Sequence, residues 1–377
     1  MDGKLAVIGL GSIGSMALWQ ASRMSDSVVG FETASPGHGR SAVGGDTRLF
    51  RMIFRGNPGL YPIMKRSRAL WAELEAETGQ DILTRCGGLS IGAADGPYIT
   101  SVLETTRLTG AEHSVLTRED MAERYPQHNL HHDDVAVFDP NAGVLRTDRA
   151  VTAAVSAAQV NGATVYTNTP IEGIEETPEG VLITSAGRSW TFENVIITSG
   201  GWSRHFMPDY LKAQTQTKRL ILTWFVAKDG ARFSPARFPV FSRVHQDRAM
   251  YGAPAVDGVT VKATLDGRGR PTPDPDSVPR DLTAAEIQET TQTVTGFLPG
   301  LHPNIVRTDA FPELFTADGH PLLGPYNEGS RIYVATGFSG GGFKNATGFG
   351  HIAAHEALGK QHFSGLDFLR PERFKTT

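Results

Sequence analysis

Residues 4–14 read KLAVIGLGSIG, an apolar run that leads directly into Gly9-x-Gly11-x-x-Gly14. The run at residues 4–8 is typical of a buried parallel strand. Residues 15–24 have a helical composition, and a second apolar run at residues 28–31 ends in Glu32. Strand, glycine turn, helix, strand and acid, in that order within about 30 residues, form the Rossmann-like pattern that binds a dinucleotide.

The spacing of the three glycines has a physical reason. Gly9 permits a tight turn, Gly11 lets the backbone approach a pyrophosphate, and Gly14 permits close packing of helix on strand. The phosphates are expected at the positive end of the helix. Glu32, 18 residues after Gly14, is placed to accept hydrogen bonds from an adenosine ribose and to repel a 2′-phosphate. The motif alone does not separate NAD from FAD, and a purely structural glycine turn is the alternative.

Composition excludes several classes of protein. The chain has 377 residues, with 40% hydrophobic and 20% charged residues, which is typical of a globular protein of two or three domains. The formal net charge of −4 argues against nucleic-acid binding. The single cysteine, Cys86, cannot form an intramolecular disulfide or a four-cysteine zinc site, and a small buried residue is its simplest interpretation. With no signal peptide and no long apolar run, we expect a soluble, cytoplasmic protein that binds no membrane.

Apolar strands followed by glycine turns recur late in the chain, at residues 194–198 before Gly200 and at residues 332–335 before Gly337. A nucleotide-binding domain built from separate pieces explains this order. We expect that domain to comprise residues 1–88, 148–215 and 318–377, and a substrate domain to comprise residues 89–147 and 216–317. Other predicted elements are helices at residues 60–78, 118–125, 148–161, 282–297 and 347–358, strands at 88–92, 162–166 and 220–227, a hairpin at 181–192, and loops at 35–46 and 266–279.

Two segments carry a resemblance to a known family, residues 44–51 (GGDTRLFR) and residues 337–344 (GFSGGGFK). Residues 141–145, 196–202, 251–252 and 316–321 support it. Together they resemble the D-amino-acid-oxidase-type FAD oxidoreductases across nearly the whole chain, in the branch of monomeric sarcosine oxidase and N-methyltryptophan oxidase. The resemblance implies an α/β (α+β two-domain) fold, with a Rossmann-like FAD-binding domain and an antiparallel-sheet substrate domain. It also implies FAD as the cofactor.

The resemblance implies roles for individual side chains. Arg51 and Lys344 would bind a substrate carboxylate, which a guanidinium contacts with two prongs. Arg48 would lie beside the flavin, Lys262 near flavin N5 to activate oxygen, and Tyr251 near the substrate. The plainer alternative for Arg51 is a surface arginine. For Lys262 it is a charge on an edge strand, and for Tyr251 it is a half-buried aromatic residue. The residues expected at the cofactor are Gly9, Gly11, Ser12, Ile13, Gly14, Glu32, Arg40, Gly44, Asp46, Thr47, Arg48, Val165, Gly200, Trp202, Gly337, Gly340, Gly341, Gly342, Phe343 and Lys344.

The implied reaction is oxidation of the C–N bond of an N-alkyl, N-methyl in particular, amino acid. The imine then gives an aldehyde and an amine, and molecular oxygen gives hydrogen peroxide. An amine dehydrogenase that uses another electron acceptor and a cyclic imino-acid oxidase are the alternatives. A non-enzymatic nucleotide-binding protein is disfavoured by the charge balance. The expected partners are a small amine carboxylate and oxygen, and the expected state is a monomer.

Departures from the family pattern bear on the substrate and on FAD attachment. Gly44 and Asp266 stand where the sarcosine oxidases carry histidines, and Ala253 replaces a bulky aromatic. These departures predict a pocket that is wider and more negative. Such a pocket favours a larger or more cationic amine than sarcosine. The sarcosine oxidases attach FAD through a cysteine just before the segment at Thr316. Because Glu313 stands at or near that position, we expect non-covalent FAD.

No metal site is expected. His128, His131, His132, Asp133 and Asp134 lie on one short stretch, which rarely gives convergent ligand geometry. The pair His351 and His355 lacks the glutamate of the zinc hydrolase motif.

Overall fold

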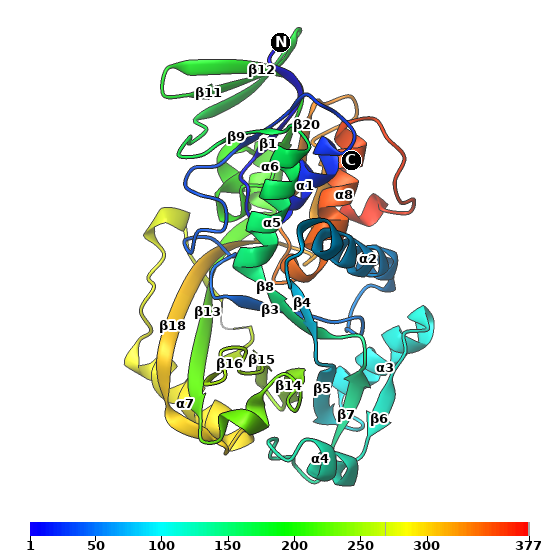
Figure 1. Ribbon diagram of the computed structural model, residues 1–377, viewed down its shortest axis with the longest axis vertical. Helices are drawn as coiled ribbons and strands as arrows, with labels where there is room; N and C mark the ends of the chain where they lie inside the picture. The colour runs from blue at the N-terminus through cyan, green and yellow to red at the C-terminus, as the bar shows by residue number, and fades with distance from the viewer. Residues whose placement is uncertain (268, 376–377) are drawn as a thin grey trace.

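The computed structural model describes residues 1–267 and 269–375. A mostly parallel sheet lies near the N-terminus, and a mostly antiparallel sheet lies at the opposite end (Figure 1). The first sheet has the order β10-β11-β12-β1-β2-β9, with β20 on β12 and β19 on β20. Its strands are β1 Gly3–Ile8, β2 Val28–Phe31, β9 Thr164–Tyr166, β10 Gly173–Thr177, β11 Gly180–Ser185, β12 Arg188–Ile197, β19 Leu322–Pro325 and β20 Ile332–Thr336.

Strand β1 is central to the first sheet and pairs in parallel with both β2 and β12. Its Leu5 and Val7 are fully buried, as the apolar run predicts for a strand covered on both faces. Strand β12 also pairs in parallel with β20. The predicted α/β fold with a Rossmann-like sheet is therefore confirmed.

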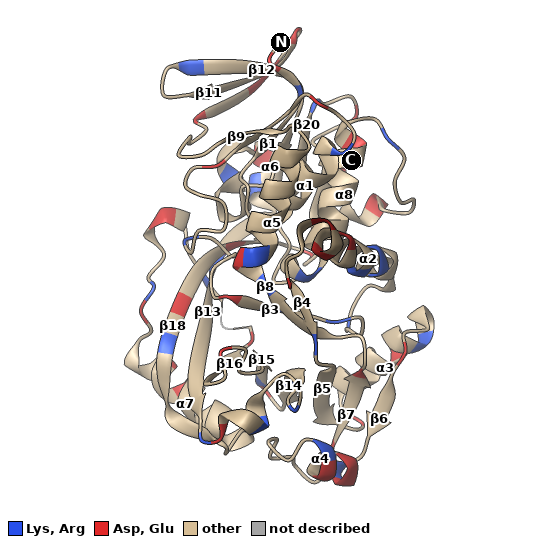
Figure 2. Ribbon diagram, in the orientation of Figure 1, with Lys and Arg blue, Asp and Glu red and all other residues tan. Residues whose placement is uncertain are grey.

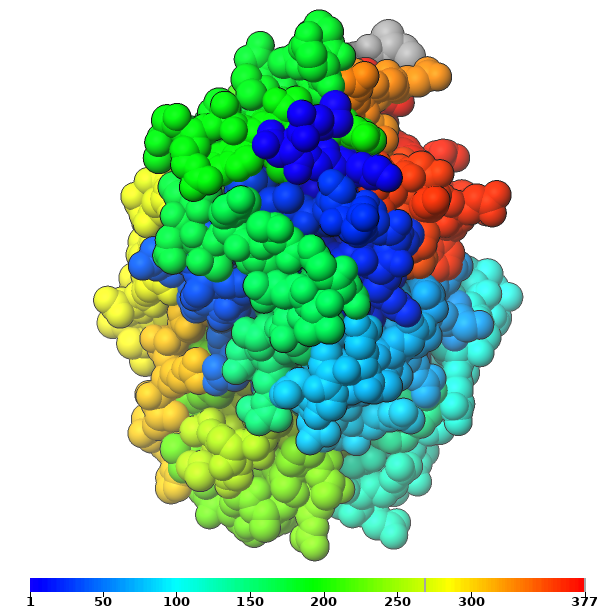
Figure 3. All heavy atoms as spheres, turned by 45° about the horizontal axis from the view of Figure 1, so that its top comes forward, coloured from blue at the N-terminus to red at the C-terminus, as the bar shows by residue number. Residues whose placement is uncertain are grey.

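Helices α1 (Ser12–Ser22), α5 (Thr147–Val160) and α8 (Ala346–Ala357) pack beside this sheet, and α2 (Tyr61–Thr78) packs on α8. A Cβ at Gly350 would lie 2.7 Å from the backbone of Met16, so α1 and α8 approach very closely. In Figure 3 the two ends of the chain and its middle share one end of the molecule. Sequentially distant pieces thus build one layer, while the domain division at residues 88, 147, 215 and 317 stays a prediction.

The start of α1 differs from the prediction. The helix begins at Ser12 rather than at residue 15, because Gly11 already has the non-helical N-cap conformation with φ −73° and ψ −152°. The last three residues of the glycine motif therefore form the first helical turn.

The second sheet has the order β17-β13-β16-β15-β14-β5-β7-β6, with β18 on β13. Its pairings are antiparallel except for that of β5 with β14. The long strands β13 and β18 pair from Thr215↔Thr316 to Ala227↔Leu301. The strands are β5 Gly88–Ala93, β6 Ser114–Leu116, β7 Asp134–Asp139, β13 Thr215–Ala227, β14 Val240–His245, β15 Arg248–Ala253, β16 Thr260–Leu265, β17 Arg270–Pro271 and β18 Leu301–Thr316.

Smaller elements join the two sheets. A third, small sheet has the order β3-β8-β4 and consists of β3 Thr47–Phe50, β8 Gly143–Arg146 and β4 Leu83–Arg85.

Helix α7 (Ala284–Phe297) carries the predicted capping box between Thr283 and Glu286. The remaining helices are α3 Pro97–Thr109, α4 Arg118–Arg124, α6 Asp209–Ala213, α7 Ala284–Phe297 and the 3₁₀ turns η1 Pro58–Leu60, η2 Gly200–Phe206, η3 Gly230–Phe233, η4 Pro275–Ser277, η5 Phe343–Asn345, η6 Asp367–Leu369 and η7 Pro371–Phe374.

The predicted exposed loop at residues 266–279 is partly wrong. Strand β17 pairs with β13 through Arg219↔Arg270, and the Thr272 amide donates to the Thr217 carbonyl at 2.9 Å. Thr272 and Pro275 are buried. The Pro- and Asp-rich composition predicts a loop, but the free edge of β13 supplies the hydrogen-bond partners that order this segment.

Lys and Arg residues and Asp and Glu residues are interspersed along the ribbon, at both ends of the molecule (Figure 2). Among the helices of residues 1–267 and 269–375, none combines the length and the hydropathy that a membrane-spanning segment requires.

Candidate active site

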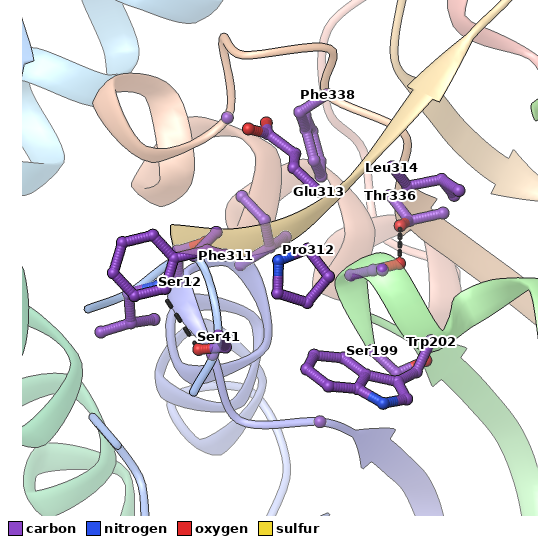
Figure 4. A pocket seen from close by; sticks show the side chains of 18 of the residues that line it. Ser12, Ser41, Ser199, Trp202, Phe311, Pro312, Glu313, Leu314, Thr336 and Phe338 are labelled. Carbon is purple, nitrogen blue, oxygen red and sulfur yellow. Dashed lines mark hydrogen bonds between the residues drawn. The ribbon is translucent and has the colours of Figure 1, made fainter. Parts of the chain in front are cut away.

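A cavity of about 720 Å³ opens where strands β1, β12 and β20 end. The three turns that follow these strands, at residues 9–13, 198–202 and 336–344, contribute to its wall. In Figure 4 residues 311–314 of β18 follow the cavity, with Ser12 and Trp202 on its sides. A crevice at the carboxyl ends of parallel strands is the usual ligand site of such sheets.

The glycine turn after β1 has the geometry of a phosphate-binding loop. Gly9 has φ +89°, and a Cβ at Gly14 would lie 1.9 Å from the Gly9 carbonyl oxygen. A Cβ at Gly11 would meet only Val43 Cγ2, at 3.8 Å, on the cavity side. No side chain caps the first turn of α1, so its amides are available to an anion. This cradle fits the pyrophosphate of a dinucleotide.

Glu32 lies in the cavity wall, as the motif predicts. Its Oε2 accepts from the Leu10 amide at 2.8 Å, and its Oε1 accepts from the Ala34 amide at 3.0 Å. Burial opposes ionisation of Glu32, but the hydrogen bonds from His38 and from these amides outweigh it and lower its pKa. An ionised carboxylate with fixed orientation therefore faces the part of the cavity expected to hold a ribose.

Most of the residues expected at the cofactor line this cavity. They are Gly9, Gly11, Ser12, Ile13, Glu32, Arg40, Arg48, Gly200, Trp202, Gly337, Gly340, Gly341, Gly342, Phe343 and Lys344. The turn at residues 337–342 needs glycine because Gly337 has φ +68° and its Cβ would lie 2.8 Å from Thr316 Cγ2. Three separate turns thus present backbone to one ligand space.

Five expected cofactor residues do not line the cavity among the residues that the structure describes. Gly14 packs helix on strand, as stated above. Gly44 packs on Phe311, because a Cβ there would lie 2.3 Å from its ring. Asp46 is exposed and pairs with Arg307. Thr47 is buried in β3, and Val165 lies in β9.

Arg51 and Lys344 face the same cavity from different elements. Arg51 directly follows β3, and Lys344 lies in η5, where its carbonyl accepts from Trp71 Nε1 at 3.1 Å. Burial, reinforced by the Arg51 charge and opposed by Asp266, lowers the pKa of Lys344 to about 8. Two cationic side chains that repel one another thus line the same cavity, an arrangement that favours an anion between them.

Arg48 and Glu313 form the cavity wall near the turn at residues 337–342. The Arg48 guanidinium donates to the carbonyls of Ala42 and Thr47 at 2.6 and 2.7 Å. Glu313 Oε1 accepts from the Gly340 amide at 2.8 Å, and burial raises the pKa of Glu313. The side chain at or near the position where the resemblance implies an attaching cysteine is thus the carboxyl group of Glu313.

Tyr251 lines the cavity from β15. Burial raises the pKa of its hydroxyl, so the phenol is neutral at physiological pH. Cys86 is partly buried beside Ala142 and Val240, away from the described cavity wall, and burial raises the pKa of its thiol to about 11.

Lys262 is a buried residue, which excludes the alternative of an edge charge. It lies in β16, between β13 and β15, with 2% of its surface exposed. Its Nζ donates to the carbonyls of Gly45 and Thr47 at 2.7 and 2.5 Å. Burial sets the pKa of Lys262 well below its ordinary value. Lys262 lies behind β3 and is not among the described residues that line the cavity.

Side chains that the sequence did not reveal complete the cavity. Ser242 in β14 accepts a hydrogen bond from Arg51 and contacts the Tyr98 hydroxyl. Phe311 and Leu222 add apolar walls. These residues carry no local motif, so only the tertiary fold brings them to the site.

The histidine-rich stretch serves packing. His128 stacks on Phe238, and Asp134 forms a buried ion pair with Arg243. Among the described residues, no group of three His, Cys, Asp or Glu side chains is placed to hold a metal ion.

Fold and cavity together define a protein of the Rossmann-like dinucleotide-binding class, with Arg51 and Lys344 in the wall of the same cavity. Residues 4–356 match the model of the family described as FAD dependent oxidoreductase, and the chain belongs to that family.

The chain is 27% identical to monomeric sarcosine oxidase of Bacillus sp. (strain B-0618), over 93% of this chain and 91% of that protein. It is also 27% identical to N-methyl-L-tryptophan oxidase of Yersinia pestis (strain Pestoides F), over 100% of both chains. The solved structure of NikD, an unusual amino acid oxidase essential for nikkomycin biosynthesis, covers 98% of this chain, and the match spans 97% of that structure, with a TM-score of 0.86 and 18% identity. The chain is therefore an FAD-dependent oxidoreductase that acts on C–N bonds.

Proposed function

We propose that this enzyme oxidises the C–N bond of an N-alkyl amino acid, N-methyl in particular, and reduces oxygen to hydrogen peroxide. The observation that carries the substrate class is the cation pair of Arg51 and Lys344 in the wall of the cavity. The relatives named as oxidases of sarcosine and N-methyl-L-tryptophan support the same class.

The residues that line the cavity fit FAD as a non-covalent cofactor. The turn at Gly9 and Gly11 would hold the pyrophosphate, Glu32 the ribose, and the turn at residues 337–342 the flavin. When bound, the flavin supplies the two-electron acceptor that no side chain provides. Glu313 stands in the wall at or near the position where the resemblance implies an attaching cysteine, so attachment through sulfur is not proposed.

The chain's own residues orient the substrate and balance the negative charge of its carboxylate. Arg51 and Lys344 would bind the carboxylate, which fixes the N-alkyl carbon relative to the cofactor space. Loss of two hydrogens from the CH–NH unit gives an imine, and water then gives an aldehyde and an amine. Oxygen takes up two electrons and two protons as hydrogen peroxide. We propose that Lys262, when protonated, acts from behind β3, where its Nζ donates to the carbonyls of Gly45 and Thr47, and that its positive charge stabilises reduced oxygen electrostatically.

Anaerobic mixing tests this function. The purified enzyme with bound FAD should lose its yellow absorbance when an N-methyl amino acid is added, and air should restore the colour with release of one peroxide per turnover. No bleaching by a panel of N-methyl and cyclic amino acids would overturn the proposal. Bleaching without peroxide in air would assign the enzyme to the dehydrogenases instead.

A further inference from the structure

Two hydroxyl groups lie directly behind Arg51. Arg51 Nη1 donates a hydrogen bond to Ser242 Oγ, and the same oxygen forms a hydrogen bond with the Tyr98 hydroxyl. Ser242 belongs to β14 and lines the cavity, whereas Tyr98 belongs to α3 and is buried. The three side chains thus form one chain of hydrogen bonds from helix α3 to the cavity.

The partners of Arg51 are neutral, which leaves its charge available. The nearby carboxylate of Asp139 accepts from the amides of Met52 and Ile53 at 2.6 and 3.0 Å, and from the Asn141 amide at 2.9 Å. None of the ion pairs among the described residues includes Arg51, and its buried Nε has no hydrogen-bond partner there. A serine hydroxyl orients a guanidinium without neutralising it, whereas a carboxylate does both.

The Tyr98 end of the chain is firmly held. Tyr98 packs in an apolar cluster with Ile53, Ile99 and Val102, and the Arg55 guanidinium lies 5.6 Å from its ring centroid. The backbone that follows Arg51 therefore packs on the same helix that holds Ser242 through Tyr98. A shift of α3 would move both supports of the guanidinium together.

We propose that Ser242, held by Tyr98, is a positioning residue that aims the Arg51 guanidinium at the substrate carboxylate. This inference rests on the proposed function, because it assumes that Arg51 binds that carboxylate. Without the hydroxyl, Arg51 keeps its charge but loses its fixed orientation. The substrate carboxylate then has to supply the ordering, so that binding weakens while the bound substrate reacts nearly as before.

The test compares Ser242→Ala with two matched variants in the FAD-loaded enzyme. Ser242→Thr keeps a hydroxyl, and Ser90→Ala removes the hydroxyl of the buried serine that pairs with Ser242 across β5 and β14. The measurements are KM and kcat for an N-methyl amino acid, and the Kd of an aliphatic carboxylate without an amine, followed by the flavin absorbance.

The expected result is a rise of about tenfold in KM and in the carboxylate Kd for Ser242→Ala, the usual effect of one lost hydrogen bond to a charged group, with kcat changed less than about threefold. Ser242→Thr should restore most of the affinity, and Ser90→Ala should match the wild type. Tyr98→Phe should give a smaller rise in the same direction and leaves the ring packing intact.

A double-mutant cycle gives the deciding result. In an Arg51→Met background, Ser242→Ala should leave the carboxylate Kd unchanged, because the hydroxyl acts only through Arg51. A Ser242→Ala effect equal to that of Ser90→Ala, or one that persists without Arg51, would overturn the inference while the proposed function stands. If the wild-type enzyme binds no carboxylate at all, both the inference and the proposed substrate class fail.

Discussion

The two walls of the cavity differ in what they present to a ligand. The wall built by the first sheet presents backbone, from the turns at residues 9–13, 198–202 and 336–342. The wall built by the second sheet, the small sheet and η5 presents side chains, among them Arg51, Ser242, Tyr251 and Lys344. Backbone amides fit any ligand with phosphates and a ring edge, whereas side chains select one substrate. We infer that the cofactor wall is general to the fold and that the substrate wall is particular to this enzyme.

The largest expected effect tests the cofactor wall. Gly14→Ala places a Cβ 1.9 Å from the Gly9 carbonyl oxygen, so β1 and α1 must separate and the phosphate cradle is lost. We expect purified Gly14→Ala to contain almost no flavin, as measured by the ratio of flavin absorbance in the visible to protein absorbance in the ultraviolet. Gly296→Ala, which has nothing within 4 Å of the added Cβ, is the control and should keep full flavin content. A yellow, fully loaded Gly14→Ala protein would contradict the assignment of this turn.

A large effect confined to the substrate wall is expected from the cation pair. Arg51→Met and Lys344→Met each remove a charged hydrogen-bond donor, so KM for an N-methyl amino acid should rise about tenfold to a hundredfold. Flavin content should stay near that of the wild type, which separates this wall from the other. Lys360→Met, at an exposed position, is the control for loss of a lysine charge. An unchanged KM in both variants would show that the carboxylate binds elsewhere.

A moderate effect concerns pH. Burial and the Arg51 charge lower the pKa of Lys344 to about 8. Lys344 is cationic below that pKa and neutral above it, so the affinity for a carboxylate should be high at neutral pH and fall as pH rises through about 8. At one pH unit above the pKa, the Kd should be higher by up to about tenfold. The Kd is measured by titrating an amine-free carboxylate into the oxidised enzyme at several pH values from about 6.5 to about 9.5, a range that brackets the transition.

The matched variant sharpens the pH test. Lys344→Met should bind the carboxylate weakly at every pH and should lack the transition near pH 8. The same transition in Lys344→Met would assign it to another group.

The smallest effect tests the attachment of FAD. Cys86 lies outside the described cavity wall, so Cys86→Ala should leave flavin content and activity unchanged. Acid precipitation of either protein should release yellow flavin into the supernatant. Flavin that stays with the pellet would contradict non-covalent binding, and release only from Cys86→Ala would identify Cys86 as the attachment point.

The two walls also differ in how far the sequence predicts them. The cofactor wall follows from contiguous motifs, because each turn comes directly after the strand that positions it. The hydrogen bonds behind Arg51 join residues 191 and 144 positions apart in sequence, and no local pattern reveals them. The sequence does not predict strand β18, for a related reason. Its half that begins at Leu301 is largely exposed and polar, and its long pairing with β13 maintains it as a strand.

The central claim is that two cations beside the cofactor space select a carboxylate. The most direct test is anaerobic reduction of the bound flavin by an N-methyl amino acid and by its primary amide, in which a neutral group of nearly the same size replaces the anionic carboxylate. The test is run at a pH where the amines of both compounds are protonated to the same extent. The account predicts that the acid reduces the wild-type flavin with an apparent Kd at least about tenfold below that of the amide, and that Lys344→Met narrows this difference. Equal reduction by acid and amide in the wild-type enzyme would contradict it.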